Sequence, residues 1–252
     1  MINFDYEFYE EPFPHIIFPN FISDSKLLNL LSNHKEFEKA NIEAPDHYRF
    51  SFYTHMYKNK SKIEKKEKKY DFLIPFDKFS EPLNSSIDSI LEAMMISHQL
   101  KNIFLKHFKQ TFIDSGYRDF KDEYILNPEQ MWASYEAYNK SKKDKRLLGW
   151  HLDNGCKLIS GMVYLKSKTD KSSDSSLWLS SGKNKPLKRV PYTNNLALFW
   201  PNVPSAWHQT GIRTATNEYR RIINYVIRTG QYWHDHKYGK GKEYGFRKVE
   251  LI

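Results

Sequence analysis

Hydrophobic positions follow a helical period in the first half of the chain. Four leucines between residues 27 and 31 come directly after Ser23 and Asp24, two residues that can cap a helix. A longer helical pattern follows Ser85 and Ser86, with apolar residues three and four positions apart as far as Phe112. The apolar run PFPHIIFPNF at 12–21 predicts a strand, whereas residues 43–57 are aromatic and irregular.

From Tyr124 onward the pattern changes to short strands. These segments are rich in β-branched and aromatic residues and are separated by turn-forming residues, including a serine-rich flexible loop at 167–176. Because no helical pattern intervenes, parallel βαβ units are not expected, and an antiparallel sandwich or barrel fits best. The strands are expected at 131–139, 157–165, 175–181, 195–200 and 219–227.

The composition describes a folded protein without disulfides or membrane spans. Of its 252 residues, 40% are hydrophobic and 16% aromatic, which is enough for one sizeable core. The only cysteine is Cys156, which excludes a disulfide scaffold. No apolar run could span a bilayer, and the acidic, aromatic start lacks the regions of a signal peptide. A soluble cytoplasmic protein with no membrane partner is therefore expected.

The net charge of +9 is concentrated in two short runs. Residues 58–69 contain seven Lys and two Glu, and residues 140–146 contain five basic residues and one Asp. Neither run has an apolar periodicity, so both are expected to be solvated loops that can steer an anionic partner. In the rest of the chain the positive and negative charges balance. The distribution therefore favours an ordinary lysine-rich surface over a surface that binds nucleic acid.

An H-x-D motif at His151 and Asp153 carries the candidate chemistry. Residues two apart on a strand face the same side, so the motif can aim an imidazole and a carboxylate at one point. The motif is weak by itself, but it precedes the expected strand 157–165, and His208 follows the expected strand 195–200. Two histidines and one carboxylate occupy one face of an octahedral metal and leave three positions open, as in non-haem Fe(II) oxygenases.

The other residues that could bind a metal are expected to have structural roles instead. Cys156 is expected to be a small core residue, and His98 and His107 are expected on a helix surface. The HDH sequence at 234–236 is expected to lie in a solvated tail.

Several segments resemble the Fe(II)/2-oxoglutarate-dependent dioxygenases, most closely their prolyl-4-hydroxylase-like branch. They are GWHLD, GMVYL, NNLALFWPNVPSAWHQT and YRRIINYVI, which span roughly residues 120–230, with a looser resemblance at 10–35. The resemblance implies a mostly β protein with a double-stranded β-helix (jelly-roll) core and a helical N-terminal region packed on it. It implies one domain, 1–252, made of a support region (1–123), a catalytic core (124–230) and a tail (231–252).

The resemblance also implies cofactors and the residues that hold them. It implies Fe(II) as the metal, 2-oxoglutarate and O2 as cosubstrates, and ascorbate as an optional reductant. An arginine matches the group that binds the far carboxylate of 2-oxoglutarate through paired hydrogen bonds. Only one of Arg220 and Arg221 can face the barrel, and Arg220 is favoured because related sequences place the first basic residue there. Tyr138 matches a tyrosine that assists the same carboxylate. The implied iron ligands are His151, Asp153 and His208.

The activity that the resemblance implies is hydroxylation of an unactivated C–H bond, with release of succinate and CO2. The substrate is expected to be a small molecule, a saccharide or carrier-linked intermediate, or a peptidyl side chain. Asp153 argues against halogenation, because a small residue replaces this carboxylate in halogenases. Ser175 and Ser176 replace a frequent glycine pair, and a long insert follows Tyr138, so the substrate-facing rim departs from the family.

Two alternatives stay open from the sequence. The positive charge suggests a nucleic-acid-directed oxidative demethylase of the same superfamily, and the jelly-roll fold also suits a non-enzymatic binding module. Residues 36–119 carry no motif that names a substrate, and the sequence does not fix the oligomeric state.

Overall fold

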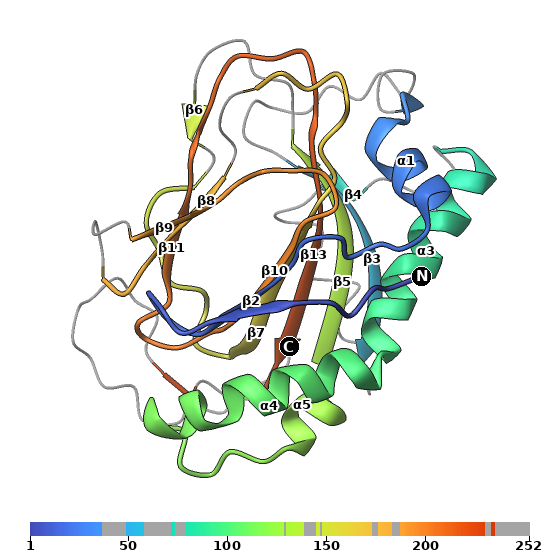
Figure 1. Ribbon diagram of the computed structural model, residues 1–252. Coiled ribbons are helices and arrows are strands. Elements are labelled where there is room, and N and C mark those ends of the chain that lie inside the picture. The colour runs from blue at the N-terminus through green and yellow to red at the C-terminus, as the bar shows by residue number, and fades with distance from the viewer. Residues whose placement is uncertain are drawn as a thin grey trace.

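A computed structural model gives the architecture of the chain (Figure 1). It describes residues 1–36, 49–57, 72–73, 79–128, 130–138, 145–146, 148–172, 176–182, 187–229 and 233–234. The described helices are α1 (Ser25–Asn33), α3 (Glu81–Ile96), α4 (His98–Asp114) and α5 (Glu123–Leu126).

An eight-stranded sheet, here called the main sheet, forms one layer. Its strand order is β1-β2-β10-β7-β13-β5-β3-β4, and every pairing is antiparallel except that of β3 with β4. Four of these strands come from the N-terminal region and extend the sheet on opposite sides, with β1 and β2 at one edge and β3 and β4 at the other. The strands are β1 (Glu7–Tyr9), β2 (His15–Phe18), β3 (Arg49–Tyr57), β4 (Phe72–Leu73), β5 (Gln130–Tyr138), β7 (Lys157–Tyr164), β10 (Ala197–Pro201) and β13 (Arg220–Arg228).

A second layer, here called the small sheet, lies opposite part of the main sheet (Figure 1). Its strands β8 (Leu177–Ser180), β9 (Lys188–Val190) and β11 (Trp207–Thr210) pair in the order β11-β8-β9. The short strands β6 (Lys145–Arg146) and β12 (Ile212–Arg213) pair beside them. Backbone hydrogen bonds between His151 and His208, 3.0 and 3.1 Å, continue this pairing alongside β11.

The chain alternates between the two layers from β5 onward. Strands β5, β7, β10 and β13 enter the main sheet, and the strands between them enter the small sheet or the β6–β12 pair beside it. This alternation of antiparallel strands between two facing sheets is the double-stranded β-helix, or jelly roll. The expectation of a mostly β fold with a jelly-roll core and packed helices is therefore confirmed.

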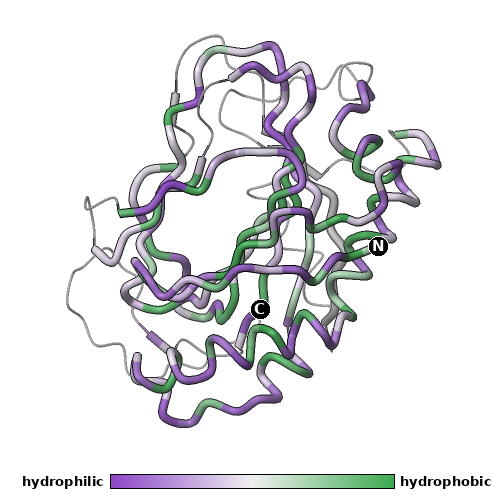
Figure 2. Tube along the Cα trace, in the orientation of Figure 1, coloured by the Kyte–Doolittle hydropathy of each residue, from purple (hydrophilic) through white to green (hydrophobic). Residues whose placement is uncertain are grey.

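The helices α3 and α4 lie along the face of the main sheet that points away from the small sheet (Figure 1). Phe104 of α4 packs on Phe199 and Tyr225, with ring centroids 5.1 and 6.0 Å apart. The strands of the main sheet are largely apolar, whereas α4 alternates between apolar and polar residues (Figure 2). This amphipathic pattern explains why the helices cover the sheet. No helix among the described residues is long and apolar enough to cross a bilayer.

Three local expectations were wrong. The helix expected after Ser85 and Ser86 begins at Glu81, because Pro82 is tolerated in a first turn, and Ser97 separates it from α4. Residues 49–57 form strand β3, which gains its regularity from pairing with β5. Lys145 and Arg146, expected in a solvated loop, form β6. The lysine-rich run 58–69 lies outside the described residues.

Candidate metal and cosubstrate site

Three potential metal ligands converge between the two sheets. His151, Asp153 and His208 each offer one ligand atom, and these atoms all lie within 4.8 Å of one another. His208 Nε2 is 4.0 Å from Asp153 Oδ2, and the two imidazole centroids are 4.3 Å apart. His151 forms an isolated bridge with His208 at the edge of the small sheet, and Asp153 follows His151 by two residues. The structure therefore brings together the three residues that the H-x-D pattern and His208 predicted.

Both imidazoles are oriented by backbone hydrogen bonds. His151 Nδ1 is 2.7 Å from the carbonyl oxygen of Gly149, and His208 Nδ1 is 3.0 Å from that of Ala206. A carbonyl oxygen only accepts, so each Nδ1 carries the proton and donates it. Burial, together with the nearby His151, lowers the pKa of His208 to about 4. The Nε2 lone pair of His208 is therefore free to bind a metal, and both rings are fixed with Nε2 as the remaining ligand atom, in the way that ligand histidines require.

The carboxylate of Asp153 is held at both oxygens. Lys157 Nζ donates to Oδ1 at 2.6 Å, and the Ser160 hydroxyl donates to Oδ2 at 2.6 Å. Burial alone would raise the pKa of Asp153, but Lys157 and the two imidazoles outweigh it and hold that pKa well below its ordinary value. Asp153 is therefore ionised at neutral pH.

The register of the main sheet shows which residues face the triad. Ser160, which contacts Asp153, lies opposite Trp200 on β10 and Val226 on β13. Directly opposed residues share a face of the sheet, and the Trp200 ring is 5.0 Å from His208. The face that carries these residues is therefore the barrel interior.

Arg220 and Arg221 lie on opposite faces of β13. Arg220 is six positions from Val226, so it shares the interior face, and it is 1% exposed. Arg221 points to the other face, where it donates to the carbonyl oxygens of Ser32 at 3.0 Å and His34 at 3.1 Å. The structure therefore places Arg220 inside the barrel and Arg221 against the end of α1.

Two tyrosines that the sequence did not single out lie next to Arg220. The guanidinium carbon is 5.4 Å from the ring of Tyr164 and 5.2 Å from that of Tyr192. Tyr164 ends the Tyr-Leu strand four residues after Ser160, a spacing that could have placed it on the interior face. Tyr192 comes from a loop and is positioned by hydrogen bonds of its hydroxyl to the backbone of Arg221. Tyr138 lies directly opposite Arg220 in the β5–β13 ladder.

The remaining candidate ligands have structural surroundings. Cys156 is buried, and its Sγ accepts from Arg228 Nε at 3.1 Å and Nη2 at 2.8 Å. His107 on α4 contacts Tyr6 rather than another ligand-type residue. His234 is buried and hydrogen-bonds to the Asn202 carbonyl oxygen at 2.9 Å. Its expected place in a solvated tail was wrong, because its neighbour Trp233 is anchored in the core.

The serine-rich loop carries a buried ion pair. Asp170 Oδ2 lies 3.1 Å from Arg213 Nη2, and both side chains are almost fully buried. The described part of this loop is therefore tied to β12, in contrast to the flexible loop expected from its composition.

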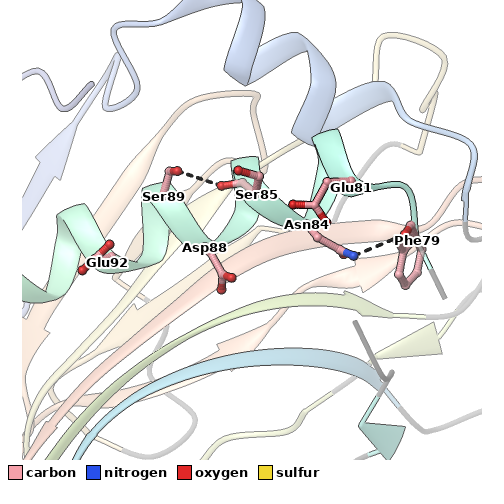
Figure 3. Close-up of a pocket in the computed structure, with 7 residues that line it drawn as sticks. All are labelled: Phe79, Glu81, Asn84, Ser85, Asp88, Ser89 and Glu92. Atoms are coloured by element: carbon pink, nitrogen blue, oxygen red, sulfur yellow. Dashed lines mark hydrogen bonds between the residues drawn. The ribbon is translucent and has the colours of Figure 1, made fainter. Parts of the chain in front are cut away.

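A hollow of about 540 Å³ borders α3, away from the triad (Figure 3). Its lining comes from Phe79, just before the helix, and from the helix itself, and it carries three carboxylates. No residue of the barrel interior contributes to this hollow. The lining residues are Phe79, Glu81, Asn84, Ser85, Asp88, Ser89 and Glu92.

Known structures with a similar arrangement include several oxygenases. A prolyl-4-hydroxylase from Pseudomonas putida is 12% identical, with 85% of this chain and 92% of that chain covered, at a TM-score of 0.46. A rice dioxygenase for auxin oxidation is 9% identical, with 89% and 76% covered, at a TM-score of 0.49. A Trichoplax adhaerens prolyl hydroxylase, solved with a hypoxia-inducible-factor peptide fragment, is 12% identical, with 85% and 83% covered, at a TM-score of 0.42.

No family model matches the sequence, and no curated protein matches it. The TM-scores of these three oxygenases are below 0.5. The function proposed below therefore rests on the fold and the site of this chain.

Proposed function

We propose that the chain is an Fe(II)- and 2-oxoglutarate-dependent oxygenase that hydroxylates an unactivated C–H bond. The observation that carries this proposal is the convergence of the ligand atoms of His151, Asp153 and His208 to within 4.8 Å of one another. Two imidazole nitrogens and one carboxylate are the donor set that non-haem Fe(II) oxygenases use, and they leave coordination positions open for other ligands. The orientation of both imidazoles and the ionised state of Asp153 fit this metal.

The interior face supplies a group for the cosubstrate. Arg220 has a permanently charged, planar guanidinium that suits the far carboxylate of 2-oxoglutarate. The rings of Tyr164 and Tyr192 flank it and limit its movement. Tyr138 lies opposite Arg220 in the ladder and is proposed to assist the same carboxylate. Arg221 lies on the other face and takes no part in this proposal.

Bound Fe(II) and 2-oxoglutarate would supply the oxidising chemistry with O2, and ascorbate would serve as an optional reductant. The residues of the chain then have separate tasks. His151, Asp153 and His208 hold the metal, and Lys157 and Ser160 fix the carboxylate of Asp153. Arg220 orients the dicarboxylate, and the surrounding aromatic residues exclude water from the interior. The proposed substrate is a small molecule, a saccharide or carrier-linked intermediate, or a peptidyl side chain.

The test is an anaerobic titration of the purified protein with Fe(II) and 2-oxoglutarate, followed by visible absorption. A charge-transfer band requires both components on one metal, so the wild type should show it. His208→Ala should abolish the band, and Arg220→Ala should shift its appearance to higher 2-oxoglutarate concentrations. His107→Ala, a histidine far from the triad in sequence and contacts, is the matched control and should retain it. Absence of a band at every concentration would leave the non-enzymatic binding module as the better assignment.

A further inference from the structure

Lys157 places an ammonium group against the carboxylate of the candidate metal site. Its Nζ is 2.6 Å from Asp153 Oδ1, and the two side chains are only 20% and 13% exposed. The other oxygen, Oδ2, is the one that lies 4.0 Å from His208 Nε2. A cation held by the three ligands would therefore share Asp153 with a fixed positive charge.

The backbone around Lys157 is anchored on several sides. Its N–H donates to the carbonyl oxygen of Asn154 at 2.8 Å. Its own carbonyl oxygen accepts from Asn202 Nδ2 at 3.2 Å and from Trp233 Nε1 at 3.0 Å. These contacts fix the first residue of β7, so the Lys157 side chain starts from a defined point near Asp153.

The charges of the site depend on Lys157. With both imidazoles neutral, the negative charge of Asp153 and the positive charge of Lys157 cancel. A divalent cation then leaves two positive charges next to Asp153, and Arg220 adds another along the interior face, so a dianion is the favoured companion of the metal. A neighbouring positive charge in a partly buried site weakens the binding of a cation and strengthens the binding of an anion.

We propose that Lys157 makes the site specific for a metal accompanied by a dianion. The ammonium group disfavours the metal alone and favours the metal together with a dicarboxylate such as 2-oxoglutarate. Because binding linkage is reciprocal, the metal raises the affinity for the dicarboxylate by the same factor. This inference rests on the proposed function, since it concerns the same three ligands.

The test measures the Mn²⁺ dissociation constant from the electron paramagnetic resonance signal of free Mn²⁺, with and without 2-oxoglutarate. In the wild type, 2-oxoglutarate should tighten Mn²⁺ binding by at least about tenfold. Lys157→Gln keeps a hydrogen-bond donor but removes the charge. It should bind Mn²⁺ alone about tenfold more tightly. At one fixed 2-oxoglutarate concentration that does not saturate the wild type, it should lose most of the tightening, because it binds the dicarboxylate more weakly. Lys157→Arg should behave like the wild type, and Lys109→Gln on α4 controls for the loss of a distant lysine.

Each outcome bears on the inference. Weaker Mn²⁺ binding by Lys157→Gln, or an unchanged effect of 2-oxoglutarate, would show that Lys157 only positions Asp153 and would overturn the proposal. If 2-oxoglutarate tightens Mn²⁺ binding by less than about threefold in the wild type, the proposal is overturned. This result needs no variant, so the test holds even if circular dichroism shows that a variant does not fold. If His208→Ala binds Mn²⁺ and 2-oxoglutarate as the wild type does, the proposed function itself fails, whatever Lys157 does.

Discussion

Arg220 and Arg221 are consecutive residues with opposite surroundings. The Arg220 guanidinium carbon lies 5.2 Å from the Tyr192 ring inside the barrel, whereas Arg221 donates to the carbonyl oxygens of Ser32 and His34 outside it. The strand alternation of β13 separates the two charges across the main sheet. One arginine is thus available to the interior site, and its neighbour attaches the end of α1.

The first prediction separates these two roles. Arg220→Ala should raise the 2-oxoglutarate dissociation constant about 10- to 100-fold, because it removes charge-assisted paired hydrogen bonds. Arg221→Ala should leave that constant unchanged in the folded protein. It should lower the free energy of unfolding by about 2–4 kcal/mol, because two buried carbonyl groups lose a charged donor. Anaerobic 2-oxoglutarate titration and urea unfolding measure the two effects. If Arg221→Ala instead raised the 2-oxoglutarate dissociation constant and Arg220→Ala did not, Arg221 would be the residue that binds the cosubstrate.

The second prediction concerns acid sensitivity. Burial lowers the pKa of His15 to about 4 and that of His34 to about 3, the second with a contribution from Arg221. Between about pH 6.5 and 4 these histidines are protonated in the unfolded chain and neutral in the folded one. The unfolded state binds more protons there, so stability should fall as the pH falls, by about 1.4 kcal/mol per unit for each histidine.

Urea unfolding of the metal-free protein at several pH values tests this expectation. His15→Gln should reduce the slope of stability against pH by the share of one histidine, although its absolute stability also changes. A slope that the substitution leaves unaltered would mean that His15 titrates alike in both states.

The third prediction concerns the contact between β7 and β10. A Cβ at Gly161 would clash with the Phe199 ring, which is itself packed among other aromatic rings. Gly161→Ala should therefore lower the free energy of unfolding by about 1–3 kcal/mol. Gly149→Ala is the matched control, because its Cβ would meet no atom within 4 Å. Equal melting temperatures for the two variants would contradict the close packing.

The fourth prediction compares a buried and an exposed ion pair. Asp170→Asn leaves the Arg213 charge buried without its carboxylate and should cost about 3–5 kcal/mol of unfolding free energy. Asp122→Asn breaks the pair with Lys109, whose side chains are 42% and 47% exposed, and should cost less than about 1 kcal/mol. Chemical denaturation of both variants measures the difference, and similar costs would argue against a buried Asp170.

Periodicity and short spacings were enough to predict strands β5, β7, β8, β10 and β13 and to group the triad. They did not predict the short strands β6, β9, β11 and β12, although β11 carries His208. The H-x-D motif predicted that His151 and Asp153 converge, because residues two apart share a face of a strand. His208 could be added to them because it follows an expected strand. The contacts of Asp153 with Lys157 and Ser160 depend on how the chain turns between the motif and β7, which spacing alone does not determine.

Other features depend on pairing between distant segments. Strand β3 was missed because its pairing with β5 joins residues far apart in the chain. The choice between Arg220 and Arg221 depends on the register of β13, and a slip of one residue would exchange their faces. Tyr192 contacts Arg220 from a loop, so no local sequence pattern predicts this contact.

The most direct experiment is an anaerobic crystal structure with Fe(II) and 2-oxoglutarate. We expect an anomalous iron peak about 2.0–2.3 Å from His151 Nε2, His208 Nε2 and an Asp153 oxygen. We also expect the far carboxylate of 2-oxoglutarate at the Arg220 guanidinium. Iron at another place, such as the acidic hollow beside α3, or 2-oxoglutarate bound away from Arg220, would contradict the account.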